Sequence, residues 1–285
     1  MAKSEEAAEI GVFGGSGFYS LLADVREVKV DTPYGSPSDS IFLADVGDRR
    51  VAFIPRHGRR HTIPPHKINY RANVWAFRSL GVKAVISPCA AGSLQLAVKP
   101  GDFVVCDQFV DRTSGRIDTF YDGPIVTHLS SAEIYDPVLR DLAIATIRDH
   151  HIPVHGSGTV VVIGGPRFST KSESKWFSDA GWEVINMTQY PEAWLCRELG
   201  MAVVNISLIT DYDAGVIEGT EAVDAMSVLE VFQQNAERIQ AVVLDLIGRF
   251  PRDLDALGAR AALEPTRGDG HVMSDGDIRL FETGL

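Results

Sequence analysis

The stretch that decides the fold is MAVVNISLITDYD, residues 201–213, in which an apolar run leads into two carboxylates one residue apart. Such a run is typical of a strand that is buried on both faces of a sheet. Burying a carboxylate costs free energy unless a partner compensates the charge. In α/β folds, small molecules bind at the carboxyl ends of strands. Asp211 and Asp213 therefore indicate a ligand site at the end of a buried strand.

The pair admits two interpretations. Side chains at i and i+2 of an extended segment point the same way, so Asp211 and Asp213 could both address one planar ring with an acceptor nitrogen and an amino group, as in a purine. Alternatively, Asp211 caps the next helix and Asp213 begins a turn before Gly215. Taken alone, the pair is explained by the cap and the turn, so the choice depends on the rest of the chain.

Composition and length favour one domain. The chain has 285 residues, of which 45% are hydrophobic, and no Pro/Ser-rich linker interrupts the first 250. We therefore predict one α/β domain over residues 1–250 and a peripheral or partly disordered tail over residues 251–285, which are polar and rich in Gly and Asp. No apolar run approaches the roughly 20 residues of a membrane span. The acidic N-terminus lacks signal-peptide features, so we expect a cytoplasmic protein without a membrane partner.

Charge and cysteine content exclude further classes of function. The net charge of −11 argues against a broad nucleic-acid-binding surface, so that any bound anion must be held by local groups. Cys89, Cys106 and Cys196 are far apart in the sequence and form no C-x-x-C pair, which argues against structural zinc and against a disulfide framework. We therefore expect no metal site.

Segments with strand-like and helix-like patterns alternate along the chain. The expected strands are residues 10–13, 41–46, 51–55, 84–88, 103–110, 159–163, 184–186 and 201–210, and the expected helices are residues 70–80, 137–150, 171–180, 191–199 and 223–249. This alternation predicts an α/β fold with a mixed, largely parallel sheet that helices cover on both faces.

Two segments after expected strands are suited to anions. The loop RHGRRH, residues 56–61, concentrates cationic side chains, and an arginine can hold two phosphate oxygens through its planar fork. A solvated basic turn is the alternative. The turn GGSG, residues 14–17, offers backbone N–H groups and the Ser16 hydroxyl to a phosphate or another oxyanion. A dinucleotide fingerprint would need a helix to begin directly after it, and no helix pattern does.

Two further strand ends carry polar side chains. In GPRFST, residues 165–170, Ser169 and Thr170 are placed either to cap the next helix or to bind an oxyanion. In NMTQYPE, residues 186–192, Thr188 lies near the strand end and Pro191 suits the first turn of a helix. Met187 stands between two polar residues, which favours an exposed position over the core.

Together and in this order, these segments resemble the purine nucleoside phosphorylase superfamily, most closely its 5′-methylthioadenosine phosphorylase branch. The resemblance runs from Gly11 to about Arg249 and includes GSL at residues 92–94, PGD at 100–102 and DQFVDRT at 107–113. It implies a single α/β domain around a twisted mixed sheet, assembled as a homotrimer or a hexamer. The implied reaction is phosphorolysis of 5′-methylthioadenosine to adenine and 5-methylthioribose 1-phosphate. Phosphate is then a co-substrate, and no metal or other cofactor is needed.

The resemblance also implies a role for individual residues. Phosphate would be bound by Ser16, Arg56, His57, Ser169 and Thr188, with backbone groups near Ala90 and Ala91. Met187 would contact the ribose, Phe168 the base, and Val228 and Leu229 the 5′ substituent, while His128 would reach the site of a neighbouring subunit. For Val228 and Leu229, ordinary helix core is an equal alternative, and His128 could be a surface histidine. Asp211 and Asp213 match the carboxylates that face N7 and the 6-amino group of the purine.

The acid–base chemistry of buried carboxyl groups agrees with this role. Free Asp has a pKa of about 3.9, and burial beside a second carboxylate raises it, so one of the pair can hold a proton at neutral pH. We expect Asp211 to donate that proton to N7 and Asp213 to accept from the amino group. A 6-oxopurine would place an oxygen against Asp213, which makes methylthioinosine a poorer substrate.

Two departures from the family pattern keep alternatives open. Ala225 is smaller than the valine common there, so a broader phosphorylase of adenosine or other purine nucleosides is the runner-up. Cys89 replaces a phosphate-binding threonine with a weaker donor. Outside this class, a nucleotide-binding oxidoreductase and a non-catalytic purine-binding module remain. The second would keep the Asp pair without needing the Arg56 and His57 loop.

Overall fold

The computed structural model describes residues 6–14, 24–122, 128–217 and 219–257, without the side chains of residues 225, 227 and 229. Its strands are β1 (Ile10–Phe13), β2 (Arg26–Val28), β3 (Ile41–Val46), β4 (Arg49–Ile54), β5 (Ala84–Ser93), β6 (Phe103–Val104), β7 (Gln108–Arg112), β8 (Val154–His155), β9 (Thr159–Ile163), β10 (Val184–Asn186) and β11 (Ala202–Asp211). Its helices are the 3₁₀ helix η1 (Pro65–Lys67) and α2 (Tyr70–Ser79), α3 (Pro137–Asp149), α4 (Lys171–Asp179), α5 (Gln189–Glu198) and α6 (Ala225–Arg249).

The sheet branches at β5. Its main path is β2-β3-β4-β1-β5-β10-β9-β7, and β11 pairs with β5 and with β6, which in turn pairs with β8. β5 runs parallel to β1 and β11 and antiparallel to β10. The carboxyl ends of β1, β5 and β11 therefore lie at one edge of the sheet, where ligands bind in α/β folds.

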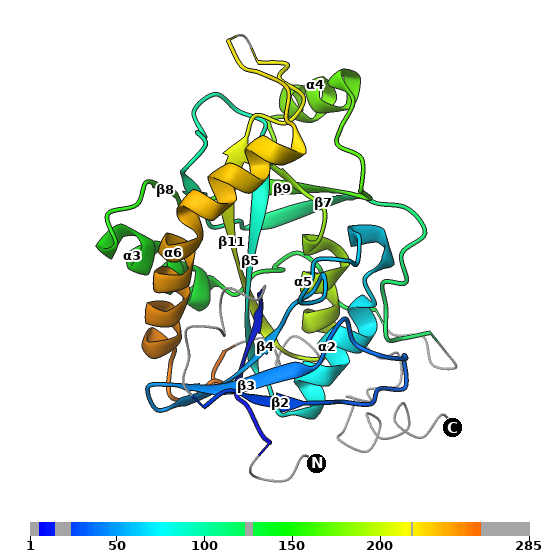
Figure 1. Ribbon diagram of the computed structural model, residues 1–285, viewed down its shortest axis with the longest axis vertical. Coiled ribbons are helices and arrows are strands. Elements are labelled where there is room, and N and C mark those ends of the chain that lie inside the picture. The colour runs from blue at the N-terminus through cyan, green and yellow to red at the C-terminus, as the bar shows by residue number, and fades with distance from the viewer. Residues whose placement is uncertain (1–5, 15–23, 123–127, 218, 258–285) are drawn as a thin grey trace.

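Helices cover the sheet on both sides, as Figure 1 shows, with α2 and α5 on one side and α3 and α6 on the other. Two large clusters of buried apolar side chains lie between these layers. One includes Trp75 of α2 and Leu195 of α5, and the other includes Leu139 of α3 and Leu246 of α6. The expected α/β class, with a mixed sheet flanked by helices, is confirmed.

Several element boundaries differ from expectation. The strand expected at residues 103–110 is wrong as one element, because the chain divides into β6 and β7. Between them, the Val105 N–H donates to His155 O beside β8, and the Asp107 N–H donates to Gly158 O just before β9. β5 extends to Ser93, well beyond the expected end at residue 88, and the short strands β2 and β8 were not anticipated.

The C-terminal end of the described chain, after α6, packs against the rest of the domain. Leu254 and Leu257 are buried in the cluster that contains α6. Arg49 of β4 donates from Nη2 to the carbonyl oxygens of Phe250 at 2.6 Å and Pro251 at 2.5 Å. Residues 251–257 of the expected tail are therefore docked, and residues 258–285 lie outside the described part. Among the described helices, none is long and apolar enough to cross a membrane.

Candidate active site

Asp211 and Asp213 are brought together by a turn. Asp211 ends β11 opposite Gly92, after a register shift that follows Ile209. Its Oδ1 accepts the backbone N–H of Asp213 at 2.8 Å, and its Oδ2 accepts the Thr210 hydroxyl at 2.7 Å. Asp213 has a φ of 48°, which is not extended, so the expectation that both side chains project from one extended segment is wrong. Gly215 N–H bonds Tyr212 O, as the turn interpretation predicted, but Asp211 does not cap a helix.

Asp211 is partly buried and Asp213 is buried, and burial is the main cause that raises the pKa of each. Asp213 is only 3% exposed, and its Oδ2 has no hydrogen-bond partner within the described residues. The hydroxyls of Ser169 and Ser174 flank Asp213 and offset part of its pKa shift, yet both are themselves buried without a hydrogen-bond partner there. A buried carboxylate oxygen without a partner points to a missing hydrogen-bond donor, which a neighbouring serine hydroxyl or a ligand can supply.

Glycine is required where β5 passes the pair. A Cβ at residue 92 would lie 2.8 Å from Asp211 Oδ1 and 3.0 Å from Ile185 Cγ2. Any side chain there would displace the carboxylate. Gly92 is thus a functional position that the sequence analysis quoted as a motif without giving it a role.

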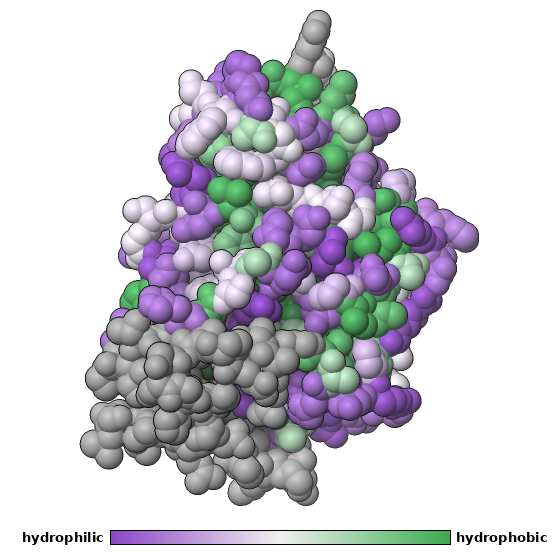
Figure 2. Space-filling model, turned by 180° about the vertical axis from the view of Figure 1, so that it is seen from behind, coloured by the Kyte–Doolittle hydropathy of each residue, from purple (hydrophilic) through white to green (hydrophobic). Residues whose placement is uncertain are grey.

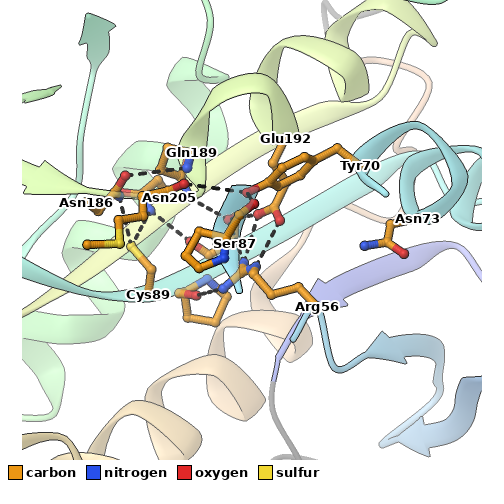
Figure 3. A network of polar contacts seen from close by, with 12 residues as sticks. Arg56, Tyr70, Asn73, Ser87, Cys89, Asn186, Gln189, Glu192 and Asn205 are labelled. Atoms are coloured by element: carbon orange, nitrogen blue, oxygen red, sulfur yellow. Dashed lines mark hydrogen bonds and ion pairs between the residues drawn. The ribbon is translucent and has the colours of Figure 1, made fainter. Parts of the chain in front are cut away.

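Arg56 is buried and held in an ion pair. Its Nε and Nη2 donate to the two carboxylate oxygens of Glu192, each at 2.8 Å, while Nη2 also donates to Ser87 Oγ at 3.1 Å and Nη1 to Pro88 O at 2.9 Å. Figure 3 shows Arg56 and Glu192 facing each other beside Ser87. A guanidinium has five N–H groups, so these contacts leave one N–H of Nη1 for a ligand. The expected fork on two phosphate oxygens is already filled by Glu192.

The network continues through buried polar side chains beneath Arg56. The Ser87 hydroxyl donates to Glu192 Oε1 at 2.6 Å and accepts from Gln189 Nε2 at 2.6 Å. Cys89 Sγ contacts the side-chain amides of Asn186 at 3.3 Å and Asn205 at 3.5 Å. Figure 3 shows the Cys89 thiol directed toward these two asparagine side chains, inside the buried network.

His57 is neutral at physiological pH. Burial lowers the pKa of His57 to about 4, and its Nδ1 lies 2.8 Å from Ile63 O. A carbonyl can only accept, so Nδ1 carries the hydrogen and Nε2 is an acceptor. The ring stacks on that of His61 with centroids 4.5 Å apart.

The structure brings other expected residues close to these groups. Thr188 is the buried N-cap residue of α5, and its hydroxyl makes no capping hydrogen bond. Ala90 and Ala91 lie on β5 between Pro88, which Arg56 binds, and Gly92, which meets Asp211. Ser169, expected to bind phosphate, instead lies beside Asp213, while Thr170 caps α4.

Met187 and Phe168 follow β10 and β9. Met187 is partly buried, and a Cβ at Gly165 would lie 2.6 Å from its sulfur, so the loop that carries Phe168 is in close contact with Met187. Phe168 is 38% exposed, which leaves its ring accessible to a ligand. Arg116, which the sequence analysis did not single out, donates to Met187 O at 2.8 Å. Nothing in the local pattern around Arg116 indicates this contact.

Four expected residues have no established position at the site, two of them because they fall outside the described part of the chain. Ser16 and the side chain of Leu229 lie outside the described residues. His128 is exposed, and Val228 is partly buried near the start of α6. Within residues 6–14, 24–122, 128–217 and 219–257, no group of three or more His, Cys, Asp or Glu side chains could hold a metal ion.

Comparison with known proteins identifies the family. The model of the phosphorylase superfamily matches residues 9–248, which include β1, the basic loop and the Asp pair. The chain belongs to the phosphorylase superfamily. A purine nucleoside phosphorylase of Streptomyces coelicolor is 48% identical over 90% of this chain and 96% of that protein. An S-methyl-5′-thioadenosine phosphorylase of Thermofilum pendens is 46% identical over 90% of this phosphorylase and 97% of its own length.

Solved structures agree with the fold of this phosphorylase. A methylthioadenosine phosphorylase from an Antarctic soil metagenomic library has a TM-score of 0.88 at 35% identity, over 96% of this chain and 98% of that chain. Methylthioadenosine phosphorylase from Schistosoma mansoni in complex with adenine has a TM-score of 0.85 at 36% identity, over 92% and 99%. The expected family, its methylthioadenosine phosphorylase branch and its fold are confirmed.

Proposed function

We propose that this enzyme cleaves 5′-methylthioadenosine with inorganic phosphate, giving adenine and 5-methylthioribose 1-phosphate. The observation that carries the proposal is the buried pair Asp211 and Asp213 at the end of β11, with pKa values raised by burial and one oxygen of Asp213 without a partner. The 6-amino group of adenine is a donor that fits this oxygen. The relatives named methylthioadenosine phosphorylases support the same substrate.

The purine is bound and protonated by the pair. As the glycosidic bond stretches, negative charge develops on the purine, and a proton donor at N7 stabilises it. Burial keeps Asp211 protonated more readily than a free carboxyl, so Asp211 donates to N7. Asp213, flanked by Ser169 and Ser174, accepts from the 6-amino group. We therefore place Ser169 with the purine, and Phe168 beside the base.

Phosphate is held by fewer charges than the basic loop suggested. Arg56 contributes its remaining Nη1 hydrogen, with Thr188, the backbone near Ala90 and Ala91, and Ser16 as the other ligands. Neutral His57 presents Nε2 as an acceptor, which suits the hydroxyl of hydrogen phosphate. Phosphate then attacks C1′ while Met187 holds the ribose, and positive charge on the ribose is stabilised by the phosphate oxygens themselves. In this proposal phosphate is a co-substrate, and the reaction needs no cofactor.

The test is a substrate panel. Methylthioadenosine, adenosine, methylthioinosine and inosine are assayed for base release with and without phosphate. Phosphate-dependent release of adenine, fastest from methylthioadenosine, is expected, and Asp213→Asn should shift preference toward the 6-oxopurines. Asp179→Asn, at an exposed position on α4, is the control and should change neither the rate of adenine release nor the preference between substrates. Equal release from methylthioinosine by the unmodified enzyme would contradict the proposal, and adenine binding without turnover would indicate a binding module.

A broader purine nucleoside phosphorylase is the second candidate, because the Streptomyces relative carries that name. Adenosine cleavage as fast as that of methylthioadenosine would favour it. We further propose a cytoplasmic homotrimer in which Val228 and Leu229 line the 5′ pocket and His128 reaches a neighbouring site. Hydrophobic residues gather in several surface patches in Figure 2. Leu96, Ile117 and Val138 are among the exposed apolar side chains, which supports an assembly.

A further inference from the structure

Arg116, in the segment between β7 and α3, meets the ends of two neighbouring strands. Its Nη2 donates to Gly164 O at 3.0 Å, just after β9, and to Met187 O at 2.8 Å, just after β10. Its Nη1 donates to the carbonyl oxygen of Tyr190, at the start of α5. Because a guanidinium is planar and rigid, these carbonyls are held at fixed separations from one another.

Arg116 is partly buried, and no ion pair with another described residue offsets the cost of that burial. Within the described part of the chain, no carboxylate lies within ion-pair distance of Arg116, and its Nε is buried without a partner. Burial is the main cause that lowers its pKa. Contacts with carbonyl groups and with the Tyr70 ring repay only part of the cost of desolvating a charge. The arrangement is better explained by the segments that Arg116 connects.

Those segments are the ones that hold the nucleoside in the proposed site. Gly164 begins the loop that carries Phe168 and Ser169, and Met187 is the proposed ribose contact. The guanidinium also lies over the ring of Tyr70, 5.1 Å from its centroid. The Tyr70 hydroxyl donates to Pro65 O at 3.0 Å, just beyond the basic loop. One side chain thus touches the purine segment and the ribose segment, and it overlies Tyr70, which bonds the chain at Pro65, beyond the basic loop.

We propose that Arg116 is a positioning residue that fixes the spacing between the purine-binding loop and the ribose-binding strand end. The proposal rests on the proposed function for the identity of the nucleoside. Nη2 holds the carbonyls of Gly164 and Met187 while Nη1 holds the carbonyl of Tyr190, so a lysine, which keeps the charge but has one nitrogen, cannot keep all three contacts. Since a misplacement of about 1 Å can cost about 10²-fold in rate, the placement by both guanidinium nitrogens matters.

The segment around Arg116 has other anchors that keep it in place. Asp118 Oδ2 accepts the Tyr190 hydroxyl at 2.6 Å. Glu198 accepts the Thr119 hydroxyl and the Phe120 N–H, each at 2.7 Å. These contacts do not involve the guanidinium, so variants of Arg116 are expected to fold with the segment attached.

The experiment compares Arg116→Lys and Arg116→Ala with a matched control, Arg140→Lys. Arg140 of α3 likewise donates to two backbone carbonyls, Cys106 O at 3.1 Å and Gly156 O at 2.7 Å. For Arg116→Lys we expect kcat/KM for methylthioadenosine to fall about 10²-fold. Adenine affinity, measured by calorimetry, should also fall, while KM for phosphate stays nearly constant. Added guanidinium ion at millimolar concentration should partly restore Arg116→Ala. Arg140→Lys should lower Tm without changing kcat/KM.

Each outcome decides the matter. Unchanged nucleoside kinetics in Arg116→Lys, equal rises of KM for nucleoside and phosphate, or the same kinetic loss in Arg140→Lys would overturn the positioning role. Guanidinium rescue of Arg116→Ala alone would support it even if the lysine variant folds poorly. If the unmodified enzyme releases no base from any nucleoside, the proposed function fails. The effect of Arg116→Lys on adenine affinity still tests the positioning role separately.

Discussion

At the scale of single residues, the candidate site depends on how buried charges are compensated. Arg56 and Glu192 are nearly inaccessible to solvent, with 8% and 1% of their side chains exposed. In such a pair, the attraction mainly repays the cost of desolvation. Glu192 therefore orients Arg56 and also limits its remaining positive field, so that phosphate meets a fixed donor and not a free cation.

Glu192→Gln should leave the Arg56 charge buried without its counter-ion. Removing one partner of a buried pair costs about 3–5 kcal/mol, so a large fall in Tm is expected in a buffer without phosphate. Phosphate binding would then offset the charge, and the rise in Tm on adding phosphate should exceed that of the unmodified enzyme. Thermal unfolding across a phosphate titration measures both. Asp179→Asn, from the exposed pair with Lys175, serves as the control, and an equal phosphate effect in all three proteins would count against the role of Glu192.

Gly92→Ala should damage the site more than the fold. Its Cβ would lie 2.8 Å from Asp211 Oδ1, so the carboxylate must move away from its turn. We expect kcat for methylthioadenosine to fall at least about tenfold, which corresponds to about 1.4 kcal/mol in the barrier. Steady-state kinetics and Tm are compared with Gly248→Ala in α6, where a Cβ meets no atom within 4 Å. Loss of Tm without loss of kcat in Gly92→Ala would show that the residue matters only for packing.

At the scale of elements, α5 connects the parts of the site. Thr188 is its N-cap residue, its first turn carries Glu192, and its last residue, Glu198, holds the segment that contains Arg116. Burial raises the pKa of Glu198 to about 7. The described residues provide it with hydrogen bonds but no cation within ion-pair distance. The carboxyl at the end of α5 is therefore easily neutralised near physiological pH.

This shift predicts a pH dependence of stability. A Glu with a folded-state pKa of about 7 and an ordinary pKa near 4.5 binds a proton in the folded state that the unfolded state has released. Stability from this group is therefore present below pH 4.5 and is lost as pH rises toward 7, by about 3 kcal/mol. Glu198→Gln does not titrate, so its stability relative to the unmodified enzyme should rise between pH 5 and pH 8.

Urea unfolding at several pH values provides the measurement. The matched control is Glu173→Gln, because the Arg167 guanidinium lowers the pKa of Glu173 to about 2 and no titration of Glu173 falls in this range. Its difference from the unmodified enzyme should be constant between pH 5 and pH 8. A difference for Glu198→Gln that is equally constant would exclude the proposed titration.

Most helices and strands, and the position of the Asp pair at a strand end, were predictable from the sequence. The contacts between residues that lie far apart in the sequence were not. Through local patterns, the apolar run before Asp211 marks a strand end and the hydroxyl of Thr170 marks the start of a helix. By contrast, Glu192 is 136 positions from Arg56, and Met187 is 71 positions from Arg116. Periodicity says which face a residue occupies but not which distant residue it meets. The turn at Asp213 likewise depends on a φ of 48°. Asp tolerates this conformation, but the residue type alone does not indicate that it is adopted.

At the scale of the whole molecule, the chain returns to its first strands after the site is complete. α6 ends at Arg249, and the following carbonyls bind Arg49 of β4, whose side chain is almost fully buried. Arg49 Nη1 also pairs with Glu9 at 3.0 Å, just before β1. The end of the domain is therefore fastened to β4, the strand that leads directly into Arg56.

Leu257→Ala should reveal how much this closure contributes. Leu257 is 4% exposed and packs in the same cluster as α6, so truncating it leaves a cavity. Leu→Ala in a core costs about 2–5 kcal/mol, and denaturant unfolding should show a loss in that range. Leu96→Ala, at a side chain that is 58% exposed, should cost much less. Activity of the folded Leu257→Ala enzyme should be unchanged, because residue 257 lies in a different part of the fold from the Asp pair. A stability loss no larger than that of Leu96→Ala would place the end of the stable domain before residue 251, as the composition of the chain alone suggested.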